Sequence, residues 1–408
     1  MKRNFRALRH YNYRLYFFAQ LVSMTGTWMQ NVAQAWLVVI LTGSAVALGT
    51  VTALQFLPIS LLTLFAGVII DRVPKRKLLL ITQSAAALQA VILGMLVWLE
   101  SVTLWQIYLL ALFLGAVNAF DQPTRQAFVA EMVPDEDLPN AIAMNSLLFN
   151  AARTIGPAVA GAVIALVGIA PSFIINSATF IAVIIALLMM DESQLRSFSG
   201  KIQTGLSEGL KEGFQFVLRT PAIASLLLTL AFVGTFGFNF STVLPLLVKF
   251  ALRGGPEILG VITSAVGIGS MIGALLVASQ TQPAKRLVYT FATCFGLLEV
   301  ALALFHHYIL SVVLLALIGM SGIAYTASTN TLLQLNSPQY MRGRVMSLYV
   351  VIFVGSTPIG ALFTGLIAEA FGIITTILVE GMLCLVGVWI GMNYLRSKPT
   401  KIDTKVGS

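Results

Sequence analysis

The chain has 408 residues, of which 58% are hydrophobic and only 10% are charged, and its formal net charge is +9. Soluble domains carry about 25% charged residues, so this composition excludes a soluble globular protein, and the apolar content excludes a disordered one. Two cysteines exclude a disulfide-rich scaffold and a cysteine-rich zinc site. The composition therefore predicts an all-α membrane protein with many spans.

Long apolar runs follow one another along the whole chain. A helix needs about 20 apolar residues to cross a bilayer, and no run shows the ten-residue alternation of a membrane β-barrel. The first run follows Met1, Lys2 and Arg3, but it is too long for a signal peptide and no small-residue cleavage site ends it, so we interpret it as a retained span. Twelve spans are predicted, at residues 14–41, 45–70, 78–99, 103–125, 138–167, 171–190, 221–248, 256–279, 286–305, 308–333, 345–368 and 371–395.

The basic residues predict how these spans are oriented. Lys and Arg gather in the amino-terminal segment, in the loops after even-numbered spans and in the tail, whereas the opposite side has only Lys249 and Arg253. The positive-inside rule then places both termini in the cytoplasm of a multi-pass protein of the cell (inner) membrane. Because the positive charges lie in short loops and not on one face, we do not expect nucleic-acid binding.

The middle of the chain is its longest polar stretch, and the segments on either side resemble each other. Residues 191–220 contain apolar side chains at helical spacing, among them Phe214 and Val217, which predicts an amphipathic linker helix. Pro157 recurs as Pro358 at a shift that also relates Ser146 to Ser347. We therefore predict two pseudo-symmetric six-helix bundles at 1–190 and 221–395, the cytoplasmic linker at 191–220 and a cytoplasmic tail at 396–408.

A charged motif follows the second span. Its sequence, Gly67-Val-Ile-Ile-Asp-Arg-Val-Pro-Lys-Arg-Lys77, resembles the Gly-x-x-x-Asp-Arg-x-Gly-Arg-Arg signature of the major facilitator superfamily, with Pro74 in place of the usual glycine. The resemblance implies a twelve-helix transporter with a cytoplasmic latch that holds the two bundles together when the site faces outward. The predicted gate consists of Gly67, Asp71, Arg72, Lys75, Arg76 and Arg125.

Two further stretches narrow the resemblance. Gly156, Pro157 and Gly161 look like the Gly-Pro helix-bend motif of the superfamily's antiporters, and Pro358 marks a second bend. The stretch from Asn118 through Arg125 to Pro134 is similar to the group that contains enterobactin exporters and macrolide-efflux proteins. This resemblance implies proton-linked export of a bulky amphipathic molecule such as a siderophore or a drug.

Polar side chains inside the spans are candidates for a substrate cavity. The superfamily lines its cavity with spans one, four, seven and ten, and polar residues recur on single faces of these spans. Helix-helix hydrogen bonding is the alternative for any single Ser or Thr. The candidates are Gln20, Thr27, Asn31, Gln34, Asn118, Thr235, Asn239, Ser321, Tyr325 and Ser328.

Four charged residues lie within predicted spans, where each costs about 3 kcal/mol or more. Asp121, Glu299 and Glu380 are candidates for proton coupling, because a carboxyl group can become neutral by protonation. Asp121 is the first choice and is expected to pair with Arg125, whereas Glu299 and Glu380 lie in spans that are usually peripheral and can be structural or lipid-facing. For Arg153 we expect a buried pair or network in preference to a substrate carboxylate.

Other functions are compatible with parts of the sequence. Uptake, or lipid movement across the bilayer, would use the same fold. Gly319-Met-Ser321-Gly322 matches the pattern of an intramembrane serine protease, but no histidine follows His307. We predict a transporter and not an enzyme, without cofactor or metal, that acts as a monomer on a small-molecule substrate with protons as the coupling ion.

Overall fold

The computed structural model describes residues 5–70, 72–196, 206–279 and 285–397, and these residues fold almost entirely into helices. Three short segments are irregular helices: the 3-10 helices Arg6–Arg9 and Glu192–Gln194 and the π-helix Leu247–Ala251. The α-helices are α1 Tyr11–Thr42, α2 Ala45–Ile70, α3 Lys75–Trp98, α4 Leu104–Met132, α5 Leu138–Val167, α6 Ala170–Leu188, α7 Leu206–Arg219, α8 Pro221–Phe236, α9 Phe240–Leu246, α10 Pro256–Ala278, α11 Lys285–Leu304, α12 Tyr308–Leu335, α13 Gln339–Phe371 and α14 Ile373–Ser397.

Eleven helical segments among the described residues are long and apolar enough to cross a membrane. One of them joins α8, α9 and the π-helix into the single segment Pro221–Ala251. Helix α1 has 32 residues but is not among the eleven. Its second half carries the polar residues Gln30, Asn31 and Gln34.

The structure confirms the amphipathic helix that was predicted between the two segments, as α7. The span predicted at 221–248 is present as Pro221–Ala251, but it is not one continuous helix, because α8 ends at Phe236 and α9 begins at Phe240. The Asn239 side chain stabilises this break. Its Nδ2 donates hydrogen bonds to the carbonyls of Thr235 and Phe236, which have no partner within α8 because the helix ends there.

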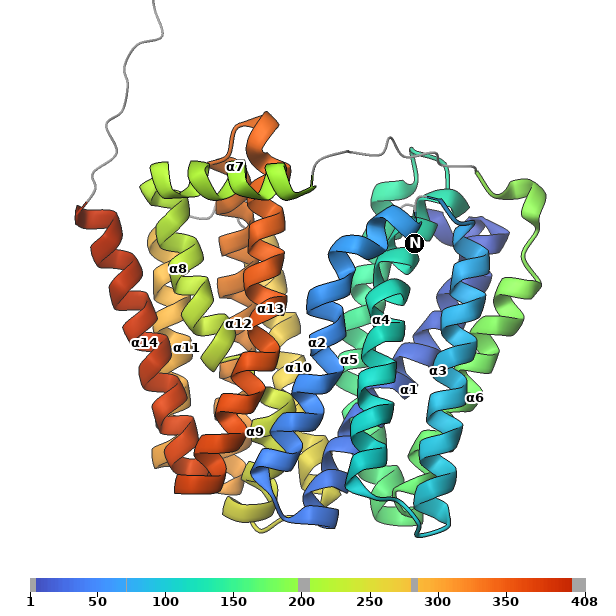
Figure 1. Cartoon of the computed structure of the whole chain (residues 1–408), viewed down its shortest axis with the longest axis horizontal. Coiled ribbons are helices and arrows are strands. Elements are labelled where there is room, and N and C mark those ends of the chain that lie inside the picture. Colours follow the sequence, from blue (N-terminus) through green and yellow to red (C-terminus); the bar gives the residue numbers. More distant parts are fainter. Residues whose placement is uncertain (1–4, 71, 197–205, 280–284, 398–408) are drawn as a thin grey trace, which may run out of the picture.

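The helices form two groups that lie next to each other (Figure 1). Helices α1–α6 pack mainly on one another and are called the first group; α8–α14 do the same, with α7 lying across α13, and are called the second group. The groups meet where α2 packs on α13 and where α5 packs on α10, and α9 reaches α1 and α2. We call the end of the helices that carries α7 the α7 side, and the opposite end the far side.

Within the second group, α10 and α12 touch at the level of their backbones. A side chain on Gly269, Gly273 or Gly319 would collide with a main-chain carbonyl of the partner helix, at Ala316, Met320 and Val266 respectively. Glycines that allow such close approach are a common way for membrane helices to associate. These two helices therefore form one tightly joined unit.

Candidate functional site

A cavity of about 300 Å³ lies within the first group, lined by α1, α2, α4 and α5. Its lining combines amides with aromatic and sulfur-containing side chains, and one guanidinium. The residues are Tyr16, Gln20, Met24, Thr27, Trp28, Asn31, Gln55, Phe56, Ile59, Asn118, Gln122, Arg125, Gln126, Asn145 and Phe149. Such a wall suits a ligand that has both polar and apolar parts.

Four of the predicted cavity residues, Gln20, Thr27, Asn31 and Asn118, line this cavity. Gln34 does not: it is buried and its amide donates to the Gln55 side chain at 3.2 Å. Gln55 in turn donates to Asn31 Oδ1 at 3.4 Å. Gln55 was missed by the sequence reasoning, although an amide inside an apolar span was a usable signal.

The predicted cavity residues of the second group are covered in this conformation. Asn239, Ser321, Tyr325 and Ser328 are buried, and Thr235 is half-buried with its hydroxyl donating to the Ala231 carbonyl. The Ser321 hydroxyl donates to the carbonyls of Leu317 and Ile318 in its own helix, and no histidine contact to it is found among the described residues.

Small residues bring the two groups together on the far side. A side chain on Gly49 would collide with the Ala361 carbonyl, and Gly365 faces the Ala45 carbonyl. Gly161 and Gly260 likewise face each other between α5 and α10. Because the backbones approach so closely at both contacts, the far side is closed.

A carboxylate from α13 completes the far-side contact. Glu369 accepts hydrogen bonds from the Ala45 amide at 2.6 Å, the Ser44 hydroxyl at 3.0 Å and the Val46 amide at 3.2 Å. These donors are at the first turn of α2, where backbone N–H groups lack partners within the helix and the helix dipole favours negative charge. Glu369 therefore caps a helix of the other group.

The helix-bend motif has a packing role in this structure. A Cβ on Gly156 would lie 2.5 Å from the Cβ of Trp28, so this glycine lets α5 approach α1. Pro157 and Pro358 are both buried inside their helices, α5 and α13. The Pro157 carbonyl faces Gly260 of α10, which places the motif at the junction of the two groups.

Asp121 is held in a polar cluster next to the cavity. Its carboxylate pairs with Arg125 Nε at 2.7 Å and accepts hydrogen bonds from the Thr82 hydroxyl at 2.7 Å and the Gln83 amide at 2.8 Å. Arg125 also donates to Gln20 at 3.3 Å. The expected Asp121–Arg125 pair is present, and α3 supplies two partners that the sequence did not reveal.

Glu299 and Glu380 are buried in the second group, so neither faces lipid. Glu380 accepts hydrogen bonds from Asn239 at the α8–α9 break and from Thr364 of α13. Glu299 of α11 packs against Gly381 and is close enough to Glu380 to interact with it electrostatically. One Glu299 oxygen has no hydrogen-bond partner. No ion pair to either carboxyl group is found in the described part of the chain.

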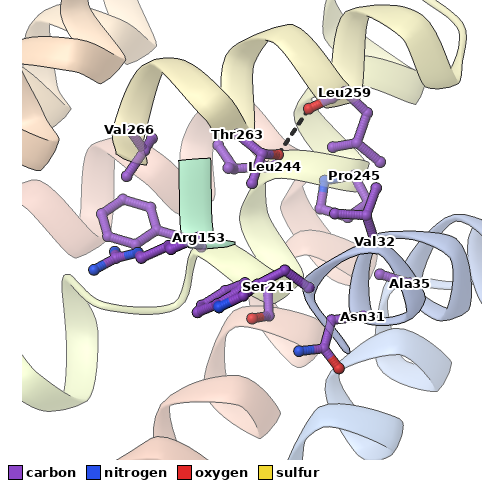
Figure 2. Close-up of a pocket in the computed structure, with 12 residues that line it drawn as sticks. Asn31, Val32, Ala35, Arg153, Ser241, Leu244, Pro245, Leu259, Thr263 and Val266 are labelled. Atoms are coloured by element: carbon purple, nitrogen blue, oxygen red, sulfur yellow. Dashed lines mark hydrogen bonds between the residues drawn. The ribbon is translucent and has the colours of Figure 1, made fainter. Parts of the chain in front are cut away.

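Arg153 lies midway along α5 in a smaller pocket of about 60 Å³ between the two groups (Figure 2). The expected buried ion pair is not found: within the described ranges no carboxylate lies within 4.0 Å of its guanidinium. The guanidinium lies over the Trp28 ring instead, 5.8 Å from its centroid.

The predicted gate residues lie at the α7 side. A side chain on Gly67 would meet no atom within 4 Å, Arg72 is exposed, and Asp71 lies outside the described residues. Lys75 pairs with Glu131 of α4 at 2.7 Å, and Arg76 donates to the Leu187 carbonyl at 2.6 Å. These contacts join helices of the first group to one another.

The α7 helix is joined to the second group in the same way, by the ion pair between Glu212 and Arg344.

The described residues contain no group of three or more His, Cys, Asp or Glu side chains that is placed to hold a metal ion.

A bilayer-spanning helical chain with a cavity lined by amide and aromatic side chains is typical of a membrane transporter, and comparison with known proteins identifies the family. A family model described as transmembrane secretion effector matches residues 3–405. The chain belongs to this family of the major facilitator superfamily, as its sequence motif predicted.

The chain is similar to the Staphyloferrin A transporter of Staphylococcus aureus, with 27% identity over 93% of this chain and 96% of the relative. It is 22% identical to Macrolide efflux protein A of Streptococcus pyogenes, over 97% of this chain and all of the relative. Its fold resembles a crystal structure of a bacterial homologue of the human lysosomal transporter Spinster, in an inward-facing and occupied conformation. That likeness has a TM-score of 0.76 at 14% identity and covers 95% of this chain and 97% of the other.

Proposed function

We propose that this protein is a proton-coupled exporter of a bulky amphipathic small molecule, such as a siderophore or a drug. The cavity of about 300 Å³, with its amide and aromatic lining, is the observation that carries the proposal. It has room for a sizeable part of such a ligand and offers both hydrogen bonds and apolar contact. The names of two relatives, Staphyloferrin A transporter and Macrolide efflux protein A, support an organic small molecule as the substrate.

Transport is proposed to occur by alternating access of two bundles. The first bundle comprises α1–α6 and the second α8–α14, and counting α1 as a span brings the total to twelve. The two bundles are related by the repeat that places Pro157 in α5 and Pro358 in α13. The α7 side is assigned to the cytoplasm because the basic loops lie there. With the far side closed, this conformation is then the one that takes substrate from the cytoplasm.

The geometry favours Glu299 and Glu380 over Asp121 as the proton site. Protonating Asp121 would sacrifice an ion pair and weaken two hydrogen bonds. Glu299 and Glu380 lack a cation among the described residues, so a proton taken up between them relieves the repulsion of two buried negative charges. Asn239, at the break between α8 and α9, contacts Glu380 directly, which gives protonation a route to a helix junction.

Purified protein in liposomes tests the coupling. An imposed pH gradient is expected to drive accumulation of a fluorescent efflux dye, and collapsing the gradient with an ionophore is expected to abolish it. The double variant Glu299→Gln, Glu380→Gln imitates the protonated pair and should exchange dye at equal rates with and without the gradient. A dye flux through the wild-type protein that does not depend on the pH gradient would refute proton coupling.

The matched variant Asp121→Asn decides between the two proton sites. If this change removes gradient dependence and the double variant keeps it, the proton site is Asp121.

The direction of transport is measured in cells. Cells that make the exporter are expected to accumulate less dye than cells without it, whereas higher accumulation would support the uptake alternative.

A further inference from the structure

Arg153 is a cation without an anion, in the middle of a helix that crosses the membrane. Arginine stays charged even when buried, and charged groups at membrane depth face water-filled cavities, partners or ligands. In the part of the chain that the structure describes, its guanidinium forms no hydrogen bond or ion pair, and it lies over the Trp28 ring, 5.8 Å from the ring centroid. Such a group is ready to bind an anion.

The contact with Trp28 positions the guanidinium without using up its hydrogen bonds. A guanidinium over an aromatic ring is held through its face, which leaves the N–H groups at its edge free to bind a carboxylate in a bidentate manner. Trp28 is itself held in place by α5, because Gly156 packs directly against it, and by an edge-to-face contact with Phe149. The cation is therefore oriented before any ligand arrives.

The rest of the pocket specifies what surrounds the anionic group. Figure 2 shows Arg153 and Asn31 at opposite sides of the pocket, with Ser241 between them and apolar side chains such as Leu244 and Val266 around the rim. Two neutral polar groups near one cation, in an otherwise apolar wall, fit a single charged head on an apolar body.

The pocket adjoins the larger cavity, since two residues line both spaces. Trp28 and Asn31 line both the pocket of about 60 Å³ and the cavity of about 300 Å³. The smaller space suits a carboxylate head and the larger one a body of many atoms. Because the pocket is lined by α1 and α5 on one side and by α9 and α10 on the other, an anion bound there contacts both helix groups.

We infer that Arg153 and Trp28 form a carboxylate-binding subsite, and that the substrates of this transporter are amphipathic organic acids. The inference names the substrate class of the exporter proposed above and rests on that function. It concerns binding alone, so it is testable without a gradient and independently of the direction of transport.

The test compares two ligands of equal size that differ in charge. Tritiated naphthaleneacetate is bound to purified protein in detergent, and unlabelled naphthaleneacetate or its neutral amide, naphthaleneacetamide, competes for it. Wild-type protein is expected to prefer the acid by about tenfold, as a charge-assisted bidentate contact provides. An equal affinity for the two, or no specific binding of either, overturns the inference.

Variants locate the preference. Arg153→Gln should bind acid and amide equally, and Arg153→Lys should keep part of the preference because it keeps the charge but loses the planar fork. Arg196→Gln, a change of the same type at an exposed pair with Asp135, should behave as wild type. A full preference for the acid in Arg153→Gln overturns the assignment. Should that variant fail to fold, an unaltered preference in both Arg153→Lys and Trp28→Leu overturns it instead.

The outcome separates this inference from the proposed function. Suppose that the preference for the acid depends on Arg153 but the dye flux does not depend on a pH gradient. The carboxylate subsite is then supported and proton coupling is refuted. Gradient-driven dye transport without an acid preference leaves the exporter in place and removes the subsite.

Discussion

The two ends of the α2–α13 contact differ in how the helix groups are joined. On the far side, Gly49 and Gly365 bring the backbones together and Glu369 caps the first turn of α2. On the α7 side, Gly67 of the same helix meets no atom of the other group. All six ion pairs found among the described residues join elements within one group.

The far-side end is therefore held by close packing of the two backbones, whereas no such packing is found at Gly67 among the described residues. The chemistry of the two ends is nevertheless parallel. Glu369 is near the end of α13 and caps the start of α2, and Asp71 follows the end of α2, from where the family resemblance implies a contact with the other bundle.

The largest effect is expected from Gly49→Ala, which places a methyl group against the Ala361 carbonyl. Overpacking of this kind costs about 1–3 kcal/mol, so the population with an open far side should rise roughly five- to hundredfold. Spin labels at the exposed far-side positions Val167 and Phe371, one in each group, report the separation.

Gly67→Ala is the matched control, since it makes the same change at the other end of α2. With no atom within 4 Å, it should leave the spin-label distances unchanged, and added helix propensity stabilises α2 by at most about 1 kcal/mol. Equal distance changes in the two variants would refute the contrast between the ends.

Glu369→Gln should have a smaller effect in the same direction. It keeps an acceptor for the Ala45 amide but removes the negative charge from the start of α2. Charges at helix ends contribute about 0.3–1 kcal/mol when exposed, so the open population should rise roughly two- to fivefold at low salt and less at high salt. Glu257→Gln is the control, because that far-side carboxylate lies beside Gly255 of its own segment.

Asp71→Asn should act in the opposite direction. If Asp71 stabilises the state in which the α7 side is closed, its loss favours the present conformation by about 0.3–1 kcal/mol. Turnover in liposomes should then fall roughly two- to threefold while substrate affinity stays the same. Unchanged turnover would remove the latch from the mechanism.

The smallest effect is expected from Glu212→Gln at the α7 side. The pair between Glu212 and Arg344 is exposed, and exposed pairs contribute less than about 1 kcal/mol. The melting temperature and the spin-label distances should match the wild type within error. A large change in either would mean that α7 helps to hold the groups together.

Hydropathy predicted the helices well, because span length and the bilayer constrain each other. It did not reveal the break at Asn239, since Gly237 and Phe238 are ordinary residues of an apolar run and only the side-chain contacts to the α8 carbonyls make the break visible.

The cavity face of α1 was readable from the spacing of Gln20, Thr27 and Asn31, because helix periodicity is local information. Their partner Gln55 and the approach of Glu299 to Glu380 depend on which helices become neighbours. The isolation of Arg153 was not readable either, since a missing partner is known only once the surroundings are folded.

The close union of α10 and α12 has a mechanical consequence. Helix α10 has 23 residues, and at 1.5 Å per residue it is about 35 Å long. Because these glycines bring the backbones of α10 and α12 into direct contact, we expect the two helices to tilt as one unit about the Gly161–Gly260 crossing near the far-side end of α10. The rise from Gly260 to Ala278 is about 27 Å, so a tilt of about 10° at the crossing would displace the opposite tip by about 5 Å, and a small rotation would be amplified into a displacement comparable to the width of a small molecule.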